Sequence, residues 1–589
     1  MRKFFVRVLA TIGAIVVLLI VIGISVSRMV RQQVPAKTVV EIELDRGLAE
    51  YVPDDPFAQV LMEKTPVVRD LVEALVKAAD DERVVAVIVR IDGAGLGLAK
   101  IQEVRDAIQT FRAKQKPAIA HAETFGEFGQ GNGAYYLATA FDEIYLQPSG
   151  DVGLTGLMVE TPFVRGTLDK LGITPRFDAR SEYKNAMNIF TEREYTPAHR
   201  EATQRVIESQ FRQIVGGIAA ARKLTEESVR ALINTGPFLG PQALEAKLVD
   251  GLAYRDEVYA KLKEKAGEDV EFLSFSEYLR RAGRPYVEGD TIALIYGVGG
   301  VQRGKSEYSP LSGDTSMGSD SVAAAFRAAV KEDKVKAILF RVDSPGGSAV
   351  ASDVIWRETV RAKEAGKPVV VSMGNVAGSG GYFVAMAADK IVAQPGTITG
   401  SIGVLAGKLI TAGFSDKIGV SWDEVHTSDN ATMWSSNLDF TPEQWSKFQE
   451  LLDWIYEDFT DKVAKGRGLP KEKVLEVAKG RIWTGEDAKA LGLVDELGGF
   501  SVALRLAKEA AGIPEDAAVH LELFPPRKTL LQTVMERVLG EEEQTQEKAT
   551  ARMLNQAFQT IRPLVRTARD LGLIAHPGAL TMPRVDPVR

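Results

Sequence analysis

Cysteine is absent from this 589-residue sequence, and only five histidines occur in it. Without cysteine the chain has no disulfide, no thiol nucleophile and no cysteine-ligated zinc. The histidines, at positions 121, 199, 426, 520 and 576, form no HExxH motif and no pair at metal-binding spacing. The net charge of −7 and the pI near 5.6 give no reason to expect nucleic acid as a partner.

Charge is also missing from one long segment near the N-terminus. The twenty residues from Val8 to Ser27 carry none. As a helix they would span roughly 30 Å, about the thickness of the hydrocarbon core of a bilayer. A cleaved signal peptide is the alternative, but this apolar core is longer than usual and "GISVSRM" (23–29) is a poor cleavage site. We therefore expect residues 1–37 to hold a short tail and an uncleaved membrane anchor.

Much of the remaining chain is an internal duplication of one sequence pattern. The segment "GNGAYYLATAFDEIYLQPSGDVGLTGL" (131–157) matches "GSGGYFVAMAADKIVAQPGTITGSIGV" (378–404) without a gap, at an offset of 247. Similarly, "ALVKAADDERVVAVIVRID" (74–92) resembles "AAVKEDKVKAILFRVD" (328–343). We expect one copy over 38–285, a second over 290–512, and a helical or linker tail over 513–589.

Each copy alternates helical patterns with short apolar runs. In the second copy the runs "KAILFRV" and "KPVVVSM" are each followed by a glycine turn, "DSPGGS" (343–348) and "GNVAGSGGYF" (374–383). Buried strands that alternate with helices predict an α/β fold with a largely parallel sheet. Both glycine turns would then lie at the carboxyl ends of strands, where such sheets place their active sites.

Ser379 is the one hydroxyl in the second glycine turn, and it opens a predicted helix. Free amides of Gly380 and of the Gly346–Gly347 turn would be positioned to form an oxyanion hole for a serine nucleophile. A helix N-cap with small neighbours is the structural alternative. The first copy has Asn132 at the equivalent position. A cap tolerates that exchange but a nucleophile does not, so only the second copy can be nucleophilic.

A serine nucleophile needs a base, and the sequence offers two candidates. His426 lies in the second copy with Asp423 and Asp429 nearby, which allows a Ser-His-Asp arrangement. Lys184, in "ARSEYKNAMN" of the first copy, aligns at the offset of 247 with Ala431. One copy has the lysine without the serine and the other has the serine without the lysine, which favours a composite site. A buried lysine loses proton affinity and then acts as a base near neutral pH.

Together, "DSPGGS", "GSGGYF", "TGSIGV" and "SEYKNAM" resemble the signal peptide peptidase SppA (protease IV) family, in its long, duplicated, membrane-anchored form. The resemblance covers residues 1 to about 515 and implies tandem crotonase/ClpP-like domains built from spiral ββα units. It implies Ser379 as nucleophile, Lys184 as general base, Ser401 as the residue that orients the lysine, and oxyanion amides at Gly380 and at Gly346 or Gly347.

The same resemblance implies a homotetramer in the bacterial inner membrane, anchored through residues 8–27, with its catalytic part facing the periplasm. Its substrates would be signal-peptide remnants and other extended apolar peptides, with no metal, nucleotide or nucleic acid involved. Two positions bear on the resemblance. Gly378 stands where the family commonly has alanine, and Val404 stands where ClpP-like enzymes have their histidine, which fits a lysine base.

Two other functions use the same features. A crotonase-like enzyme acting on acyl-CoA would use the oxyanion hole without a nucleophile, and a membrane scaffold would bind apolar peptides without cleaving them. The membrane anchor and the serine at 379 argue against the first, and peptide binding without an acyl-enzyme would favour the second. The sequence therefore predicts a membrane-anchored serine endopeptidase with a Ser-Lys dyad.

Overall fold

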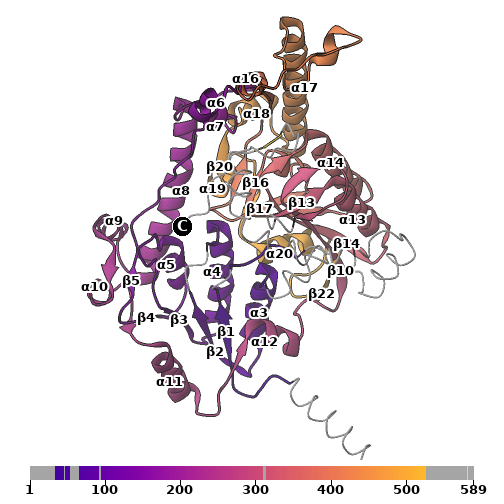
Figure 1. The fold of residues 1–589 in the computed structure, drawn as a ribbon. Coiled ribbons are helices and arrows are strands. Elements are labelled where there is room, and N and C mark those ends of the chain that lie inside the picture. Colours follow the sequence, from indigo (N-terminus) through magenta and orange to yellow (C-terminus); the bar gives the residue numbers. More distant parts are fainter. Residues whose placement is uncertain are drawn as a thin grey trace, which may run out of the picture.

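The chain folds into two similar α/β halves, indigo to magenta and pink to yellow in Figure 1. This computed structural model describes residues 33–44, 47–52, 65–91, 95–309, 314–525 and 580–581. The predicted anchor at residues 8–27 and most of the predicted tail lie outside the described residues. Among the described helices, none combines the length and the apolar character that crossing a bilayer requires.

The first half is built on a six-stranded sheet whose neighbouring strands are all parallel, in the order β8-β4-β3-β2-β1-β9. The strands are β1 (Thr38–Glu43), β2 (Val84–Arg90), β3 (Ala118–Ala122), β4 (Glu143–Leu146), β8 (Gly251–Leu252) and β9 (Glu271–Ser274). Successive residues of β2 face opposite sides of this sheet. Val87 and Val89 belong to the large core, whereas Ala86 and Ile88 belong to a smaller cluster on the other side. Both faces are therefore buried, which explains the unbroken apolar runs.

The second half repeats this order as β21-β17-β16-β14-β10-β22, again with parallel neighbours. Its strands are β10 (Asp290–Val298), β14 (Val335–Ser344), β16 (Val369–Gly378), β17 (Lys390–Ala393), β21 (Glu496–Leu497) and β22 (Val519–Leu523). From Val376 onward, β16 also pairs with β18 (Ile398–Gly400), and β20 (Ile482–Thr484) runs antiparallel to β18. The second half continues past the expected boundary at 512, because the chain returns to cover the free edge of β10 with β22.

The helices repeat as well. The clearest pairs are α3 (Val68–Asp80) with α13 (Ser319–Lys331), α4 (Leu98–Arg112) with α14 (Ala349–Glu364), α5 (Asn132–Ala138) with α15 (Gly380–Phe383), and α8 (Pro197–Arg222) with α17 (Pro442–Arg467). Both α8 and α17 have 26 residues and start with a Thr-Pro pair, in which the threonine side chain accepts a hydrogen bond from a first-turn amide. Each ends at a residue with positive φ, Lys223 or Gly468.

Shorter elements complete the described fold. The remaining helices are α6 (Arg165–Leu171), α7 (Asn188–Thr191), α9 (Glu226–Thr235), α10 (Gly240–Glu245), α11 (Arg255–Ala266), α12 (Phe275–Ala282), α16 (Ala412–Lys417), η1 (Asp429–Thr432), α18 (Lys471–Val477), α19 (Gly485–Ala490) and α20 (Phe500–Ala510). A two-stranded pair joins β5 (Asp151–Val152) to β7 (Phe238–Leu239).

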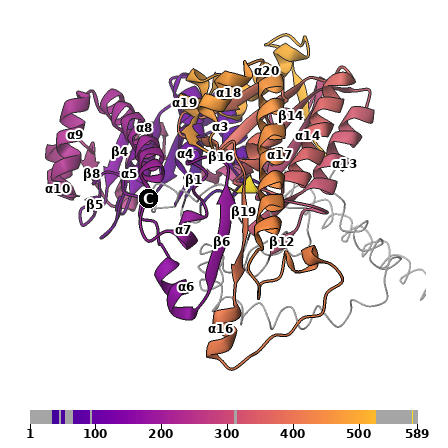
Figure 2. The ribbon, with the colours of Figure 1, turned by 90° about the horizontal axis from the view of Figure 1, so that it is seen from above.

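The two halves share a two-stranded sheet, to which each contributes one strand. In the first half, β6 (Thr174–Ala179) runs antiparallel to β19 (Leu405–Ile410) of the second, and the two lie side by side in Figure 2. The same interface contains an apolar cluster of Ala202 and Val206 from α8 with Ile398 and Ile482. It also contains a buried ionic network, described in the Discussion. Contacts between the halves are therefore apolar, ionic and backbone-paired at once.

A small sheet lies beside the first glycine turn, in the order β12-β13-β11-β15-β23. Its strands are β11 (Gly300–Gln302), β12 (Tyr308–Ser309), β13 (Asp314–Gly318), β15 (Gly346–Gly347) and β23 (Leu580–Thr581). The glycine turn thus forms a two-residue strand, and β23 pairs antiparallel with it. Leu580 and Thr581 are more than 200 residues away in sequence, and the tail's composition gave no sign of this pairing.

Candidate active site

Ser379 lies at the junction between β16 and α15. Its backbone has φ 55° and ψ −117°, a conformation that residues other than glycine seldom adopt. The Ser379 amide donates to the Gly400 carbonyl at 2.8 Å, which ties the junction to β18. Ser379 occupies the N-cap position of α15, yet its side chain makes no capping hydrogen bond. The structure therefore does not favour the helix-cap interpretation, because the hydroxyl points to another partner.

That partner is Lys184 of the first half. Beyond β6 the chain stays against the second half, because the Arg180 amide donates to the Val404 carbonyl at 2.9 Å. Three residues later the Tyr183 amide donates to the Lys479 carbonyl at 3.2 Å. Backbone hydrogen bonds between the halves thus position Lys184 next to Ser379.

The two predicted catalytic side chains meet in a buried position. Lys184 Nζ lies 2.7 Å from Ser379 Oγ, 2.9 Å from the Ser401 carbonyl oxygen and 3.1 Å from Ser401 Oγ. Ser379 and Ser401 are 0% exposed and Lys184 is 1% exposed. Among the described residues no carboxylate forms an ion pair with Lys184. Burial, which disfavours the charged form, lowers the pKa of the Lys184 ammonium well below its ordinary value.

The first glycine turn lies next to Ser379. A Cβ built on Gly380 would lie 3.0 Å from the Gly347 nitrogen and 2.7 Å from Ser352 Oγ, so a side chain there would crowd the glycine turn. The Gly346 amide donates to Ser344 Oγ at 3.2 Å. Of the three glycines predicted for the oxyanion hole, Gly346 donates to a side chain, Gly346 and Gly347 both pair with β23, and Gly380 lies against this turn beside the serine.

The equivalent position of the first half holds a structural asparagine. Asn132 Oδ1 accepts from the amides of Thr155 and Gly156 at 3.1 and 3.0 Å, and its Nδ2 donates to the Gly156 carbonyl at 2.9 Å. The side chain thus fixes the loop that corresponds to the Ser401 segment. The first half contributes a lysine to the candidate site and no nucleophile.

Several known peptidases have sequences similar to this chain. The sequence pattern of Peptidase family S49 matches residues 110–269 and 361–514, one segment in each half. The chain belongs to peptidase family S49. It is similar to Protease 4 of Salmonella typhi, with 33% identity over 84% of this chain and 78% of that protein. It also resembles the chloroplastic serine protease SPPA of Arabidopsis thaliana, with 34% identity over 78% of this chain and 68% of that protein.

Protease 4 of Haemophilus influenzae is 32% identical over 77% of this chain and 74% of its own. Membership of family S49 makes the chain an SppA-like serine peptidase, as the motifs predicted. Among solved structures, a mutant of ClpP1 from Listeria monocytogenes overlaps 36% of this chain and 94% of its own, with a TM-score of 0.23 and 13% identity.

The histidine alternative is not supported by the geometry of this S49 peptidase. His426, Asp423 and Asp429 are all exposed, in the segment between α16 and α17. In Figure 2 this segment extends away from the sheet that carries β16. Ser379 is fully buried, and its hydroxyl contacts Lys184 instead.

Another glycine-rich segment, "GGVQRGKS" (residues 299–306), has the spacing of a phosphate-binding P-loop. A P-loop requires a strand that leads through the loop directly into a helix. Here Gly300–Gln302 is a strand, and the next helix in the described part of the chain begins at Ser319. The segment serves the small sheet instead, since Ser306 Oγ accepts from the Gly318 amide at 3.0 Å.

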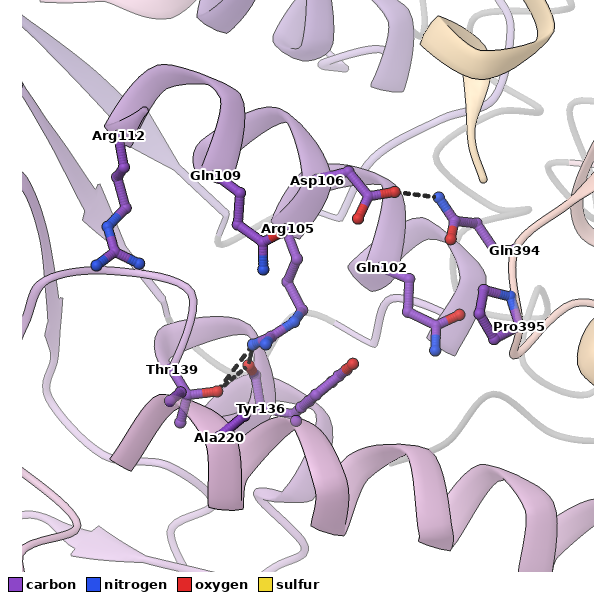
Figure 3. A pocket seen from close by; sticks show the side chains of 12 residues that line it. Gln102, Arg105, Asp106, Gln109, Arg112, Tyr136, Thr139, Ala220, Gln394 and Pro395 are labelled. Carbon is purple, nitrogen blue, oxygen red and sulfur yellow. Dashed lines mark hydrogen bonds between the residues drawn. The ribbon is translucent and has the colours of Figure 1, made fainter. Parts of the chain in front are cut away.

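A cavity of about 430 Å³ lies between α4, α8 and the β17–β18 connection (Figure 3). Its charged side chains are satisfied by the protein. Arg105 donates to the carbonyl of Tyr136, Asp106 accepts from Gln394 at 2.7 Å, and Arg112 pairs with a neighbouring aspartate. None of the candidate catalytic residues lines it, so we assign it no part in catalysis.

Removing the Ser401 hydroxyl tests how the lysine is held. The Ser401→Ala variant is expected to lower kcat roughly 5- to 10-fold, because one hydrogen bond of about 1 kcal/mol to the Lys184 amine is lost. Without the Ser401 hydroxyl, the Lys184 ammonium has one acceptor fewer, so the pKa of Lys184 falls. The rising limb of the pH–activity profile then shifts to lower pH. Ser401 has φ 51°, which alanine tolerates as well as serine does, so the backbone is not strained further.

The matched control is Ser209→Ala, which removes an equally buried hydroxyl at the interface of the halves, bonded to Thr484 at 3.0 Å. It is expected to leave the pH profile unchanged. Full activity and an unchanged pH profile in Ser401→Ala would show that Ser401 does not orient the lysine.

Proposed function

We propose that this chain is a membrane-anchored endopeptidase that uses a Ser379–Lys184 dyad to degrade cleaved signal peptides and similar apolar peptides. The observation that carries the proposal is the 2.7 Å approach of Lys184 Nζ to Ser379 Oγ. Family membership supplies the serine-peptidase activity, and the buried pair supplies a nucleophile and a base. The same order of strands in both halves supports a duplicated domain, and its ClpP-like character rests on the sequence resemblance.

The hydrogen-bond partners of Lys184 suit a neutral amine. A neutral amine has two N–H donors and one lone pair. The Ser401 carbonyl oxygen and Ser401 Oγ accept from the two donors, at 2.9 and 3.1 Å. The lone pair then faces the Ser379 hydroxyl. Since burial lowers the pKa of Lys184, this neutral form exists without an extreme pH.

The reaction follows from that arrangement. Lys184 Nζ takes the proton as Ser379 Oγ attacks the scissile carbonyl carbon, and the amides of Gly347 and Gly380 stabilise the oxyanion. The lysine ammonium then protonates the leaving amine, the peptide C–N bond breaks, and an ester joins the acyl group to Ser379. Water, deprotonated by Lys184, attacks this ester, and the proton returns to Ser379 Oγ. No metal or cofactor is needed for this sequence.

An extended peptide fits the edge beside the glycine turn. Strands that add to a sheet edge gain backbone hydrogen bonds, while alternate side chains enter pockets that set specificity. Residues Leu580–Thr581 of the chain itself lie antiparallel to Gly346–Gly347, so this edge accepts a backbone strand. A signal-peptide remnant that took the place of Leu580–Thr581 on this edge would bring a carbonyl group to the amides of Gly347 and Gly380.

The proposed location and assembly rest on the sequence. The uncharged run of residues 8–27 would anchor the protein in the bacterial inner membrane, with both halves on the periplasmic side. Released signal peptides are apolar and remain near this membrane, so an anchored peptidase would meet them there. We also propose that the protein is a homotetramer, because its sequence resembles the SppA family.

The test uses the detergent-solubilised full chain, a signal-peptide-derived peptide and a fluorophosphonate, which labels activated serines. Cleavage of the peptide with one adduct, located on Ser379 by mass spectrometry, is the expected result. Peptide binding without cleavage or adduct would favour the scaffold. Turnover of CoA thioesters without cleavage of the peptide would favour the crotonase-like enzyme.

A further inference from the structure

The structure shows a close-packed turn beneath Lys184 that the sequence analysis did not identify. This turn, residues 478–481, connects α18 to β20. Two consecutive residues in it have positive φ, Lys479 at 53° and Gly480 at 76°. The Gly480 amide donates to the Ile402 carbonyl at 2.8 Å, and the Arg481 carbonyl accepts from the Ser401 amide at 2.7 Å. The turn is therefore fixed to the segment that carries Ser401.

The same turn also holds the lysine segment of the first half. The Lys479 carbonyl accepts from the Tyr183 amide at 3.2 Å, and the Gly480 carbonyl accepts from Ser401 Oγ at 3.4 Å. One turn thus binds the backbone next to Lys184 and both the backbone and the side chain of Ser401. These are the two residues whose separation sets the direction of the lysine amine.

Gly480 is the point of closest approach. A Cβ built on it would lie 2.5 Å from the Lys184 nitrogen and 2.6 Å from the Lys184 Cα, distances that real Cβ atoms do not show. The obstacle is backbone, which cannot rotate away as a flexible side chain can. Any side chain at position 480 must therefore push the Lys184 backbone away from the second half.

We infer that Gly480 is a positioning residue for the reaction, because the absence of a side chain there seats Lys184 against Ser379 and Ser401. This inference rests on the proposed Ser-Lys dyad. Gly480 acts through the lysine and touches neither Ser379 nor the substrate in our proposal. A misplacement of about 1 Å at a reacting group commonly costs about 10²-fold in rate.

Displacement would also change the protonation of the lysine. Burial is the cause that lowers the pKa of Lys184. The charged groups around the turn pair with one another: Lys479 with Glu182 at 3.7 Å, and Arg481 with Glu201 at 2.6 Å. Moving the lysine outward admits water, which stabilises the ammonium, so its pKa rises. Because the neutral amine is the active form, the rising limb of the pH–activity profile moves to higher pH.

The test compares Gly480→Ala with Gly366→Ala in the full-length protein. Gly366 has the same φ of 76°, but a Cβ there meets nothing within 4 Å. The two positions share the same φ, and only a side chain at the first would meet Lys184. We expect Gly480→Ala to lower kcat by about 10²-fold or more, with little change in KM and a shift of the rising limb to higher pH. Gly366→Ala should keep the wild-type kcat and pH profile.

A wild-type kcat and pH limb in Gly480→Ala would overturn the inference. If Gly480→Ala does not fold, Gly403→Ala decides, because its Cβ would lie 2.8 Å from the Gly480 Cα and 3.3 Å from the Lys184 Cδ. This milder overlap is expected to lower kcat in the same direction, and full activity would reject the inference.

Lys184→Ala is measured in the same series to separate the two claims. An active Lys184→Ala variant would contradict the proposed dyad itself. An inactive Lys184→Ala variant beside a fully active Gly480→Ala variant would contradict only the proposed role of Gly480.

Discussion

The Ser379→Ala variant is expected to lower kcat by about 10⁶-fold, the loss typical of removing the nucleophile from a serine peptidase. Lys184→Ala should be almost as inactive, because a serine hydroxyl without a base is a poor nucleophile. The two losses should not add in the double variant, since each residue is useless to the reaction without the other. His426→Ala is expected to keep the wild-type rate.

The measurement is cleavage of an apolar peptide by the solubilised full chain and each variant, after circular dichroism has shown that all are folded. Normal activity in Lys184→Ala together with an inactive His426→Ala would place the base within the second half. The complementary distribution of serine and lysine between the copies would then be coincidence. Loss in Ser379→Ala and Lys184→Ala alone would explain why the domain is duplicated.

The sequence predicted the repeating part of the fold well. Apolar runs such as "KAILFRV" and "KPVVVSM" became β14 and β16, and their equivalents became β2 and β3. Buried parallel strands leave this signal because both faces contact a core, which demands an uninterrupted apolar run. The internal repeat then doubled the evidence for each element. It also marked Ser379 and Lys184, through differences between copies that should otherwise match.

The sequence did not reveal what brings these two residues together. The pairing of β6 with β19 joins residues more than 220 positions apart, and neither strand has a pattern that names its partner. Gly480 was missed for a similar reason. A glycine in a turn is usually explained by its local φ. Only the folded structure shows that the Lys184 backbone lies where a side chain of residue 480 would be. Local patterns thus predicted the parts, whereas long-range contacts set the geometry of the site.

The second large effect concerns the buried ionic network between the halves. Arg341 of β14 is 2% exposed and donates from Nε to Glu50 at 2.6 Å and from Nη2 to Glu103 of α4 at 2.7 Å. Burial alone would lower the pKa of Arg341, but the two carboxylates outweigh it and raise the pKa. Arg341→Met should lower the free energy of unfolding by about 3–5 kcal/mol, because it leaves both carboxylates buried with their partner removed.

A matched control is the same substitution at an exposed Arg–Glu pair. Arg357 pairs with Glu364 at 3.3 Å, and their side chains are 51% and 59% exposed. Arg357→Met should change the free energy of unfolding by about 0–1 kcal/mol, since water screens the pair and solvates whichever partner remains. Denaturant unfolding of the full chain measures both variants, and equal midpoints for the two would contradict the buried-network argument.

A double variant shows whether the penalty comes from the stranded charge. Glu50 retains Lys100, whose Nζ lies 3.5 Å away, whereas Glu103 loses its only ion-pair partner in the described part of the chain. Arg341→Met with Glu103→Met should therefore be more stable than Arg341→Met alone, because an apolar pair replaces a buried unpaired carboxylate. Since Arg341 and Glu103 belong to different halves, peptidase activity should follow stability across these variants. A single variant that loses stability but keeps the wild-type kcat would show that the ionic network is not needed to bring Lys184 to Ser379.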